Sequence, residues 1–200
     1  GKSGQLAWEI ARLVPDAVCL GRDDIDITTA ESIADKLDTL APDAVINASA
    51  YTAVDKAESD EANAYLLNQT AVANLANYCK AHNVFFVHVS TDYVFNGEKG
   101  SPYTVDDTIA PQGMYGKTKA AGEAEVKSIL PEHSAIIRTS WVYSAHGNNF
   151  VKTMLRLMAE KPQLGVIDDQ LGSPTWAKGL AQACIEAATQ QHTGVFHWSD

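Results

Sequence analysis

Helical and strand-like hydrophobic patterns alternate along this chain. Apolar side chains recur with a helical period in six stretches, and short runs of consecutive apolar residues lie between them. The pattern predicts helices over 5–14, 61–82, 114–130, 150–160 and 177–189, and one from a cap at Thr28 or Thr29 to Leu40. It predicts strands over 17–20, 43–47, 85–89, 135–138, 164–167 and 195–198, and an irregular loop over 97–111.

The predicted strands are apolar throughout rather than alternating between apolar and polar residues. Such strands are typical of a parallel sheet with helices on both faces, so the predicted fold class is α/β, a Rossmann-like doubly wound parallel sheet. Ligands of these sheets bind in the loops at the carboxyl ends of the strands. Candidate chemistry is therefore sought in those loops.

Composition narrows the function classes. The formal net charge is −10, and the Lys and Arg residues do not cluster, which disfavours a nucleic-acid partner. No apolar run reaches the roughly 20 residues of a membrane span. Cys19, Cys79 and Cys184 lie far apart without metal-ligand spacing, so we expect reduced thiols in a cytoplasmic protein.

A glycine-containing loop, residues 1–7, directly precedes the first predicted helix. Glycines let the backbone approach a pyrophosphate, and a helix amino terminus offers N–H donors to it. Ala7 stands where this kind of loop often has a third glycine. Taken alone, the pattern fits a plain turn before a helix equally well.

Two strand ends carry small or hydroxyl side chains. Residues 47–52 read Asn-Ala-Ser-Ala-Tyr-Thr, where a cofactor can lie against the backbone or the strand end can simply be tightly packed. Ser90 and Thr91 follow the strand 85–89, where hydroxyls meet a substrate. Tyr93 and Phe95 are expected to be packing residues.

Tyr115 and Lys119 are four residues apart, so they share one face of the helix predicted over 114–130. A nearby ammonium lowers the pKa of a phenol, which suits a group that exchanges a proton with a substrate oxygen. An ordinary solvated pair is the alternative for this spacing alone.

The order of these segments resembles the extended short-chain dehydrogenases, and most closely the dTDP-4-dehydrorhamnose reductase family. The resemblance runs over nearly the whole chain, in segments 1–6, 20–28, 42–58, 90–97, 111–123, 138–143, 147–150 and 169–175. The most specific are Ala-Val-Asp-Lys-Ala-Glu at 53–58 and Asp-Gln-Leu-Gly-Ser-Pro-Thr at 169–175.

The resemblance implies roles for matching residues. It implies that Tyr115 is the proton donor, that Lys119 binds the nicotinamide ribose, and that Thr91 hydrogen-bonds the substrate carbonyl. The implied cofactor-binding residues are Gly1, Gly4, Gln5, Leu6, Asp26, Ile27, Ala50, Tyr51, Thr52, Tyr115 and Lys119, and the implied substrate residues are Thr91, Asp92 and Trp141.

The end of the predicted strand 17–20 bears on the cofactor. Gly21 stands where NAD-specific folds place an acidic side chain, and Arg22 suits a 2′-phosphate. Asp23 and Asp24 compete, either as the acidic residue or as ion-pair partners of Arg22. We expect NADPH to be preferred and NADH to be accepted.

The resemblance implies two regions and one reaction. Residues 1–145 are expected to form the NAD(P)-binding domain without its first strand, and 146–200 part of a smaller substrate-binding lobe mixed with sheet elements. The expected reaction is reduction of the 4-keto group of dTDP-4-dehydro-L-rhamnose to dTDP-L-rhamnose, for cell-surface polysaccharide. Alternatives are another nucleotide-sugar epimerase or dehydratase, which segment 169–175 disfavours, and a non-catalytic NADP-binding regulatory subunit, which the complete catalytic set disfavours.

The sequence places few constraints on assembly and on metal binding. A homodimer is possible. The acidic residues Glu58, Asp60 and Glu61, and also Asp168 and Asp169, make Mg²⁺ conceivable, but acids also favour helix starts, so no metal is assigned. The histidines show no metal-ligand spacing.

Overall fold

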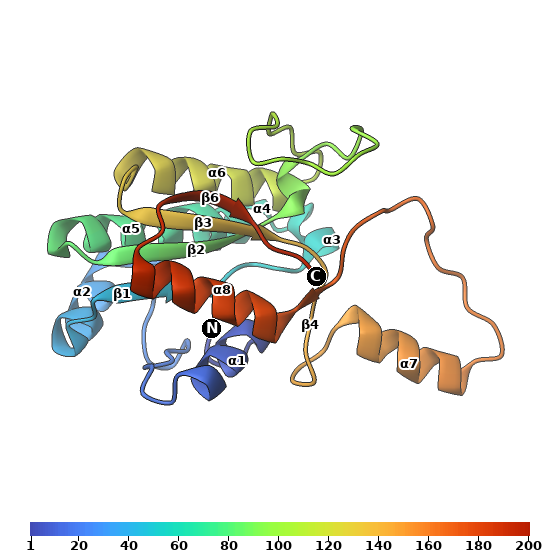
Figure 1. The fold of residues 1–200 in the computed structure, drawn as a ribbon, viewed down its shortest axis with the longest axis horizontal. Helices are drawn as coiled ribbons and strands as arrows, with labels where there is room; N and C mark the ends of the chain where they lie inside the picture. Colours follow the sequence, from blue (N-terminus) through green and yellow to red (C-terminus); the bar gives the residue numbers. More distant parts are fainter.

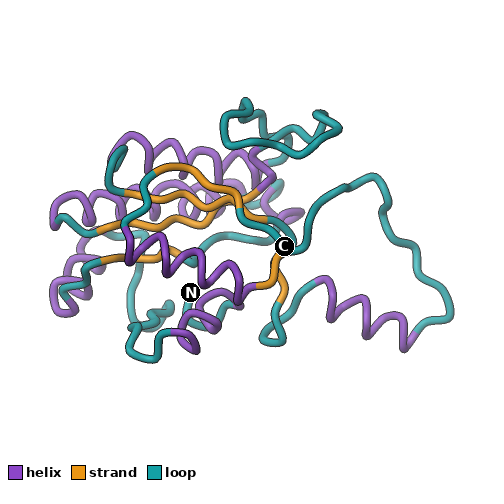
Figure 2. Tube along the Cα trace, viewed as in Figure 1, coloured by secondary structure: helices purple, strands orange, loops and turns teal.

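The computed structural model describes residues 1–200, the whole sequence, as a parallel sheet between layers of helices (Figures 1 and 2). The helices are α1 Gln5–Leu13, α2 Ala30–Leu40, α3 Val54–Ala57, α4 Glu61–Tyr65, α5 Ala71–His82, α6 Met114–Ile129, α7 Phe150–Glu160 and α8 Ala177–Gln190, with a π-helical turn η1 Leu66–Thr70 and a 3-10 turn η2 Asp92–Val94. The strands are β1 Ala44–Asn47, β2 Phe85–Thr91, β3 Ser134–Thr139, β4 Val142–Tyr143, β5 Thr175–Trp176 and β6 Gly194–His197.

The main sheet has the order β1-β2-β3-β6, and every pair is parallel. The register aligns Asn47 with His88, and Thr91 with Thr139. Because all four strands run the same way, their carboxyl ends lie at one edge of the sheet. The α/β class and the parallel, Rossmann-like sheet are confirmed.

Alternate residues of the strands face two separate cores. Phe86 packs with side chains of α2, α5 and α6, whereas Phe85 and Val87 pack with α1 and α8 on the other face. Figure 1 shows α6 on one side of the strands and α8 on the other. The apolar strands of the sequence are thus explained, since both faces of the sheet are covered.

Two predicted strands are absent. Residues 17–20 form no strand. Leu20 O accepts from the Gly1 and Lys2 nitrogens, at 3.1 and 3.0 Å, but the Ala17 nitrogen bonds back to Val14 O, and no ladder with another strand of this chain results. Residues 164–167 form an exposed loop with Val166 57% and Ile167 70% exposed. An apolar run makes a strand only where a neighbouring strand accepts its backbone hydrogen bonds.

The predicted helix 61–82 is interrupted by the π-helical turn η1, and the short pair β4–β5 was not predicted. The helix α7 stands away from the sheet and contains no buried residue (Figure 1). In contrast, α8 and β6 belong to the sheet and its covering layer. No helix has the length and apolar character needed to cross a membrane.

Candidate active site

The glycine loop lies against the segment that follows β1. Gly4 is the N-cap of α1, and its nitrogen donates to Gly1 O at 2.9 Å. The Gly1 nitrogen donates to Ser49 Oγ at 2.7 Å, and a Cβ on Gly1 would lie 2.9 Å from Ala48 O. The first turn of α1 carries no acidic side chain. This exposed, glycine-lined helix start therefore fits the pyrophosphate of a dinucleotide.

The next two residues of α1 are held by other parts of the chain. Gln5 donates to Val142 O at 3.4 Å and accepts from Asn149 at 2.9 Å. Leu6 is buried in the core shared with α8, so its backbone N–H, rather than its side chain, is the group available to a ligand.

The loop after residue 20 separates its charged groups. Asp24 pairs with Lys2 at 2.7 Å and accepts from the Gly21 nitrogen at 2.8 Å. Arg22 is exposed and forms no ion pair, so the alternative in which an aspartate neutralises it is wrong. Its guanidinium is free to bind an anion.

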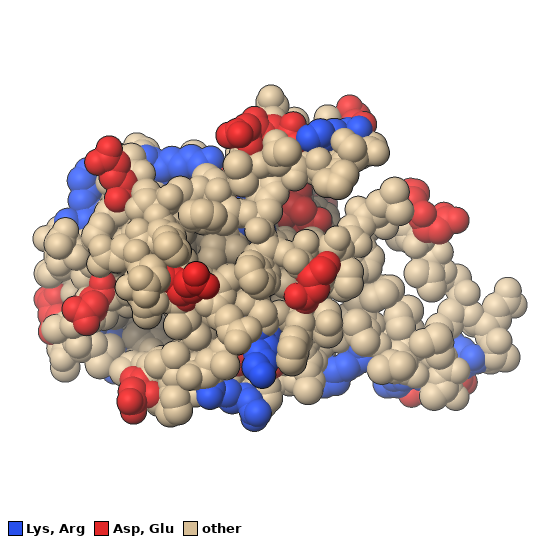
Figure 3. All heavy atoms as spheres, viewed as in Figure 1, with Lys and Arg blue, Asp and Glu red and all other residues tan.

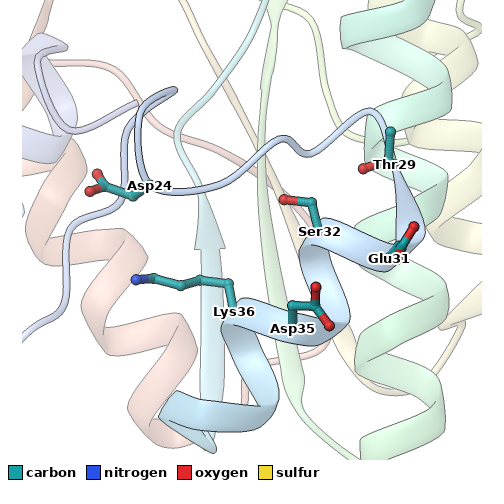
Figure 4. Close-up of a pocket in the computed structure, with 6 residues that line it drawn as sticks. All are labelled: Asp24, Thr29, Glu31, Ser32, Asp35 and Lys36. Carbon is teal, nitrogen blue, oxygen red and sulfur yellow. The ribbon is translucent and has the colours of Figure 1, made fainter.

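Asp26 and Ile27 follow in the same loop. Asp26 accepts from the Thr28 nitrogen at 2.9 Å and from the Thr28 hydroxyl at 2.7 Å, while Ile27 packs on the α2–α5 core. A hollow beside them has a wholly polar lining of Asp24, Thr29, Glu31, Ser32, Asp35 and Lys36 (Figure 4). Three carboxylates against one ammonium make this hollow unsuited to a phosphate.

Tyr51 is fixed by a residue that the sequence analysis did not select. The buried Asn68 side chain accepts from the Tyr51 nitrogen at 2.8 Å and donates to Tyr51 O at 3.1 Å and Thr118 Oγ1 at 3.0 Å. Ala50 and Thr52 flank this clamped position. Asn68 lies in η1, so the widened helical turn ties the segment after β1 to α6.

The end of β2 meets the start of α6. Thr91 Oγ1 donates to Asp92 Oδ1 at 3.0 Å and accepts from the Tyr93 nitrogen at 3.2 Å. The rings of Tyr93 and Tyr115 pack edge to face with centroids 5.6 Å apart, and Tyr93 remains 39% exposed, so it packs on one side only. A Cβ on Gly116 would lie 2.2 Å from Tyr93 O, so only glycine permits this approach of α6.

Burial sets the acidity of the groups at this junction. It raises the pKa of Tyr115 to about 12, and a hydrogen bond with Thr91 opposes the rise. The expectation that Lys119 lowers the pKa of Tyr115 is therefore wrong here, because desolvation of the phenolate outweighs any attraction. Burial also raises the pKa of Asp92, against its hydrogen bond from Thr91.

Lys119 is buried directly beneath the end of β2. Its Nζ donates to Val89 O at 2.7 Å and lies 3.4 Å from His88 Nε2. Burial lowers the pKa of Lys119 to about 8, and the charge of Glu123 opposes this shift. The structure thus brings Thr91, Tyr115 and Lys119 to one sheet edge, next to the segment 48–52 and the glycine loop.

Trp141 follows β3 at the same edge. Its backbone is left-handed with φ 47°, and its ring packs edge to face on Phe150 of α7, with centroids 5.1 Å apart. A Cβ on Gly172 would lie 2.9 Å from Trp141 Nε1. Trp141 therefore joins the sheet to the protruding segment 145–174.

Two of the acidic residues considered for Mg²⁺ are engaged within the protein. Glu58 accepts from the Met114 nitrogen at 2.7 Å, at the start of α6. Asp60 accepts from Tyr51 Oη at 2.9 Å and from Asn63 at 2.7 Å. These contacts are structural, and no group of three or more metal-ligating side chains is present.

Comparison with known proteins assigns the chain to a family. A family model described as the RmlD substrate binding domain matches residues 1–200. The dTDP-4-dehydrorhamnose reductase of Burkholderia thailandensis is 42% identical over 98% of this chain and 68% of its own length. The chain belongs to the dTDP-4-dehydrorhamnose reductase family.

Other members agree with this assignment. The dTDP-4-dehydrorhamnose reductase of Escherichia coli is 42% identical over 94% of this chain and 64% of its own length. The crystal structure of the reductase of Bacillus anthracis in complex with NADP superposes with a TM-score of 0.96, at 34% identity, over all of this chain and 72% of that one. The chain thus spans about two thirds of the length of the reductases that it matches.

Proposed function

We propose that this chain is the cofactor-binding and catalytic part of an NAD(P)H-dependent reductase that converts dTDP-4-dehydro-L-rhamnose to dTDP-L-rhamnose. The observation that carries the proposal is the meeting of Thr91, Tyr115 and Lys119 beside a glycine-lined helix start, in a chain of this reductase family. The family assignment favours the reductase over an epimerase, a dehydratase or a regulatory subunit.

The nicotinamide cofactor, when bound, supplies the hydride. Gly1, Gly4, Gln5 and Leu6 would hold its pyrophosphate at the start of α1. Asp26 and Ile27 would lie by the adenine, residues 50–52 would line its path along the end of β1, and Lys119 would bind the nicotinamide ribose.

Tyr115 gives the proton in this scheme. A ketone becomes an alcohol when its carbon receives a hydride and its oxygen a proton, so the donor must hold its proton beforehand. A pKa of about 12 keeps Tyr115 protonated at neutral pH. Thr91 would bond the same carbonyl oxygen, while Asp92 and Trp141 would contact the sugar nucleotide.

NADPH is the preferred cofactor in this proposal, and NADH is accepted. Support comes from the exposed and unpaired Arg22 next to Gly21, and from the NADP complex of the Bacillus anthracis relative. A guanidinium binds a 2′-phosphate through charge-assisted hydrogen bonds, which the 2′-hydroxyl of NADH does not offer.

The remaining expectations form part of the same proposal. Residues 1–145 would be the cofactor-binding domain, and 146–200 part of the sugar-nucleotide lobe, with α7 and its flanking loops standing away from the sheet (Figure 1). Three free cysteines, two of them buried, favour a cytoplasmic location.

On the face shown in Figure 3, acidic and basic side chains are interspersed over a mostly uncharged surface.

The test is a cofactor-oxidation assay on the full-length gene product. With dTDP-4-dehydro-L-rhamnose and NADPH, we expect loss of nicotinamide absorbance in step with formation of dTDP-L-rhamnose. Oxidation of NADPH without that product, or none under conditions where a known family member is active, would refute the proposed reaction.

A further inference from the structure

A line of hydrogen bonds leads from the end of β1 to Lys119. The Ser49 nitrogen donates to Asn47 Oδ1 at 3.0 Å, and Asn47 Nδ2 lies 3.3 Å from His88 Nδ1. His88 Nε2 in turn lies 3.4 Å from Lys119 Nζ. Asn47, His88 and Lys119 are all buried, so no solvent competes for these groups.

The donor and acceptor roles along this line of hydrogen bonds follow from the Ser49 nitrogen, where the line begins. A backbone N–H only donates, so Ser49 fixes the Asn47 oxygen as its acceptor and turns the Asn47 NH₂ toward His88. An amide NH₂ also only donates, so His88 Nδ1 must accept. A neutral imidazole then carries its proton on Nε2. Burial and the charge of Lys119 lower the pKa of His88 well below its ordinary value, which keeps the ring neutral.

The proton on His88 Nε2 points at Lys119 Nζ. An ammonium has three donors and no acceptor, whereas an amine has a lone pair. Lys119 already uses one N–H on Val89 O. The contact with His88 therefore favours the amine of Lys119 over its ammonium.

The other charged groups around Lys119 oppose this preference only weakly. Glu123 favours the ammonium, but Arg138 binds both of its carboxylate oxygens, at 2.9 and 2.7 Å. The titratable and charged groups that adjoin Lys119 on β2, η2, α6 and β3 include His88, Asp92, Tyr93, Tyr115, Glu123 and Arg138. Lys117, Glu125 and Lys127 lie on other, less buried positions of α6. Burial raises the pKa of Asp92, and it also raises the pKa values of Tyr115 and Tyr93, which are neutral phenols at neutral pH.

We infer that His88 is a positioning residue for Lys119: its Nε2–H, fixed by Asn47, stabilises the amine that remains when Lys119 gives up a proton. This role rests on the proposed function. In that reaction, the Tyr115 O–H bond breaks as its proton moves to the substrate oxygen. The Tyr115 phenolate then takes a proton from the ammonium of Lys119, which becomes an amine. The amine of Lys119 is then reprotonated from solvent.

The first test reads the tautomer of His88 and needs no turnover. In the ¹⁵N-histidine-labelled protein, the nitrogen shifts of the assigned ring are expected to show a neutral imidazole with the proton on Nε2 throughout the range from pH 6 to 9. A proton on Nδ1, or an imidazolium, would overturn the inference.

The second test reverses the donor and acceptor roles along this line of hydrogen bonds. In Asn47→Asp the carboxylate accepts from Nδ1–H, so Nε2 becomes an acceptor for the ammonium of Lys119. The pKa of Lys119, followed through the ¹³Cε signal of labelled lysine, is expected to rise by about one unit, the scale of a hydrogen bond moved from the neutral to the charged form. The basic limb of the kcat–pH profile is expected to move with it.

A control variant tests whether a carboxylate added elsewhere in the protein has the same effect. Asn74→Asp makes the same change on α5, where Asn74 contacts Thr28 O, and should alter neither the His88 tautomer nor the pKa of Lys119. A rise at Lys119 in Asn47→Asp without a change of tautomer would contradict the inference. An inactive wild type with the Nε2–H tautomer would refute only the proposed function.

Discussion

Arg138 and Glu123 form a buried ion pair behind the candidate active site. Arg138 Nε and Nη2 donate to the two Glu123 oxygens at 2.9 and 2.7 Å, and both side chains are at most 2% exposed. Glu123 lies one helical turn after Lys119 on α6, and Arg138 lies on β3. The pair holds the helix that carries Tyr115 and Lys119 on the sheet.

Breaking this pair should destabilise the fold. Arg138→Met removes both hydrogen bonds to the buried Glu123 carboxylate and leaves it only the half-exposed Lys127, 3.6 Å away, so we expect the free energy of unfolding to fall by up to about 3–5 kcal/mol in urea titrations. The double variant Arg138→Met/Glu123→Leu should recover much of that loss, because no uncompensated charge remains. A single variant as stable as the wild type would show that the pair does not fix α6.

Lys119→Met should change how stability depends on pH. The folded state releases the Lys119 proton near pH 8, whereas an ordinary lysine holds it to about 10.5. The unfolded chain binds more protons between these values, so Lys119 makes the free energy of unfolding rise with pH there and penalises the fold below pH 8. Relative to wild type, Lys119→Met should be more stable near pH 7 than near pH 10.5 by about 3 kcal/mol.

The measurement is urea unfolding of both proteins across this range. Cys79 and Cys184, whose pKa values burial raises to about 12, lower stability at high pH, but they do so equally in both proteins. A difference between the two proteins that stays constant with pH would contradict a lowered pKa at Lys119.

Tyr115→Phe should abolish most turnover without disturbing the fold. It removes only the phenol oxygen, and loss of a general acid costs roughly 10²–10⁴ in rate. Single-turnover oxidation of NADPH should slow by this factor, whereas the melting temperature and the Kd of NADPH should change little. Turnover close to wild type would remove Tyr115 from the role of proton donor.

Arg22→Ala should reduce the preference for NADPH. A hydrogen bond to a charged group contributes about 1.5–3 kcal/mol, so kcat/KM for NADPH should fall roughly 10- to 100-fold while the value for NADH stays near wild type. Lys2→Ala is a useful comparison, because Lys2 is already paired with Asp24. A wild type that favours NADH, or an equal loss of kcat/KM for both cofactors in Arg22→Ala, would contradict the proposed binding of the 2′-phosphate by Arg22.

The sequence predicted the sheet and most of its helices because their apolar patterns report burial directly. Helix 150–160 was predicted at its observed bounds, although none of its residues is buried in this chain. The runs 17–20 and 164–167 have equally apolar patterns but pair with no other strand of residues 1–200. Pairing depends on the rest of the fold, so hydrophobic pattern alone cannot decide it.

The candidate site was predicted through its motifs, but its supporting residues were not. Asn47 was seen only as part of a strand end, and His88 only as a histidine within a strand. Asn68 belongs to a π-helical turn that no simple period describes. A polar residue inside an apolar run, such as His88 in Phe-Phe-Val-His-Val, is the one available signal, because a buried polar group requires a partner.

In the proposed reaction, the cofactor delivers its hydride to the 4-keto carbon of a dTDP-linked sugar while Tyr115 protonates the oxygen. The most direct test incubates the full-length enzyme with dTDP-4-dehydro-L-rhamnose and NADPH deuterated at nicotinamide C4, in the stereoisomer from which the enzyme transfers deuterium, and locates the label in the product by NMR. We expect one deuterium at C4 of the rhamnose, and its near absence with Tyr115→Phe over the same time. Product without deuterium at C4 from either deuterated stereoisomer, or label at another carbon, would contradict the proposed hydride transfer.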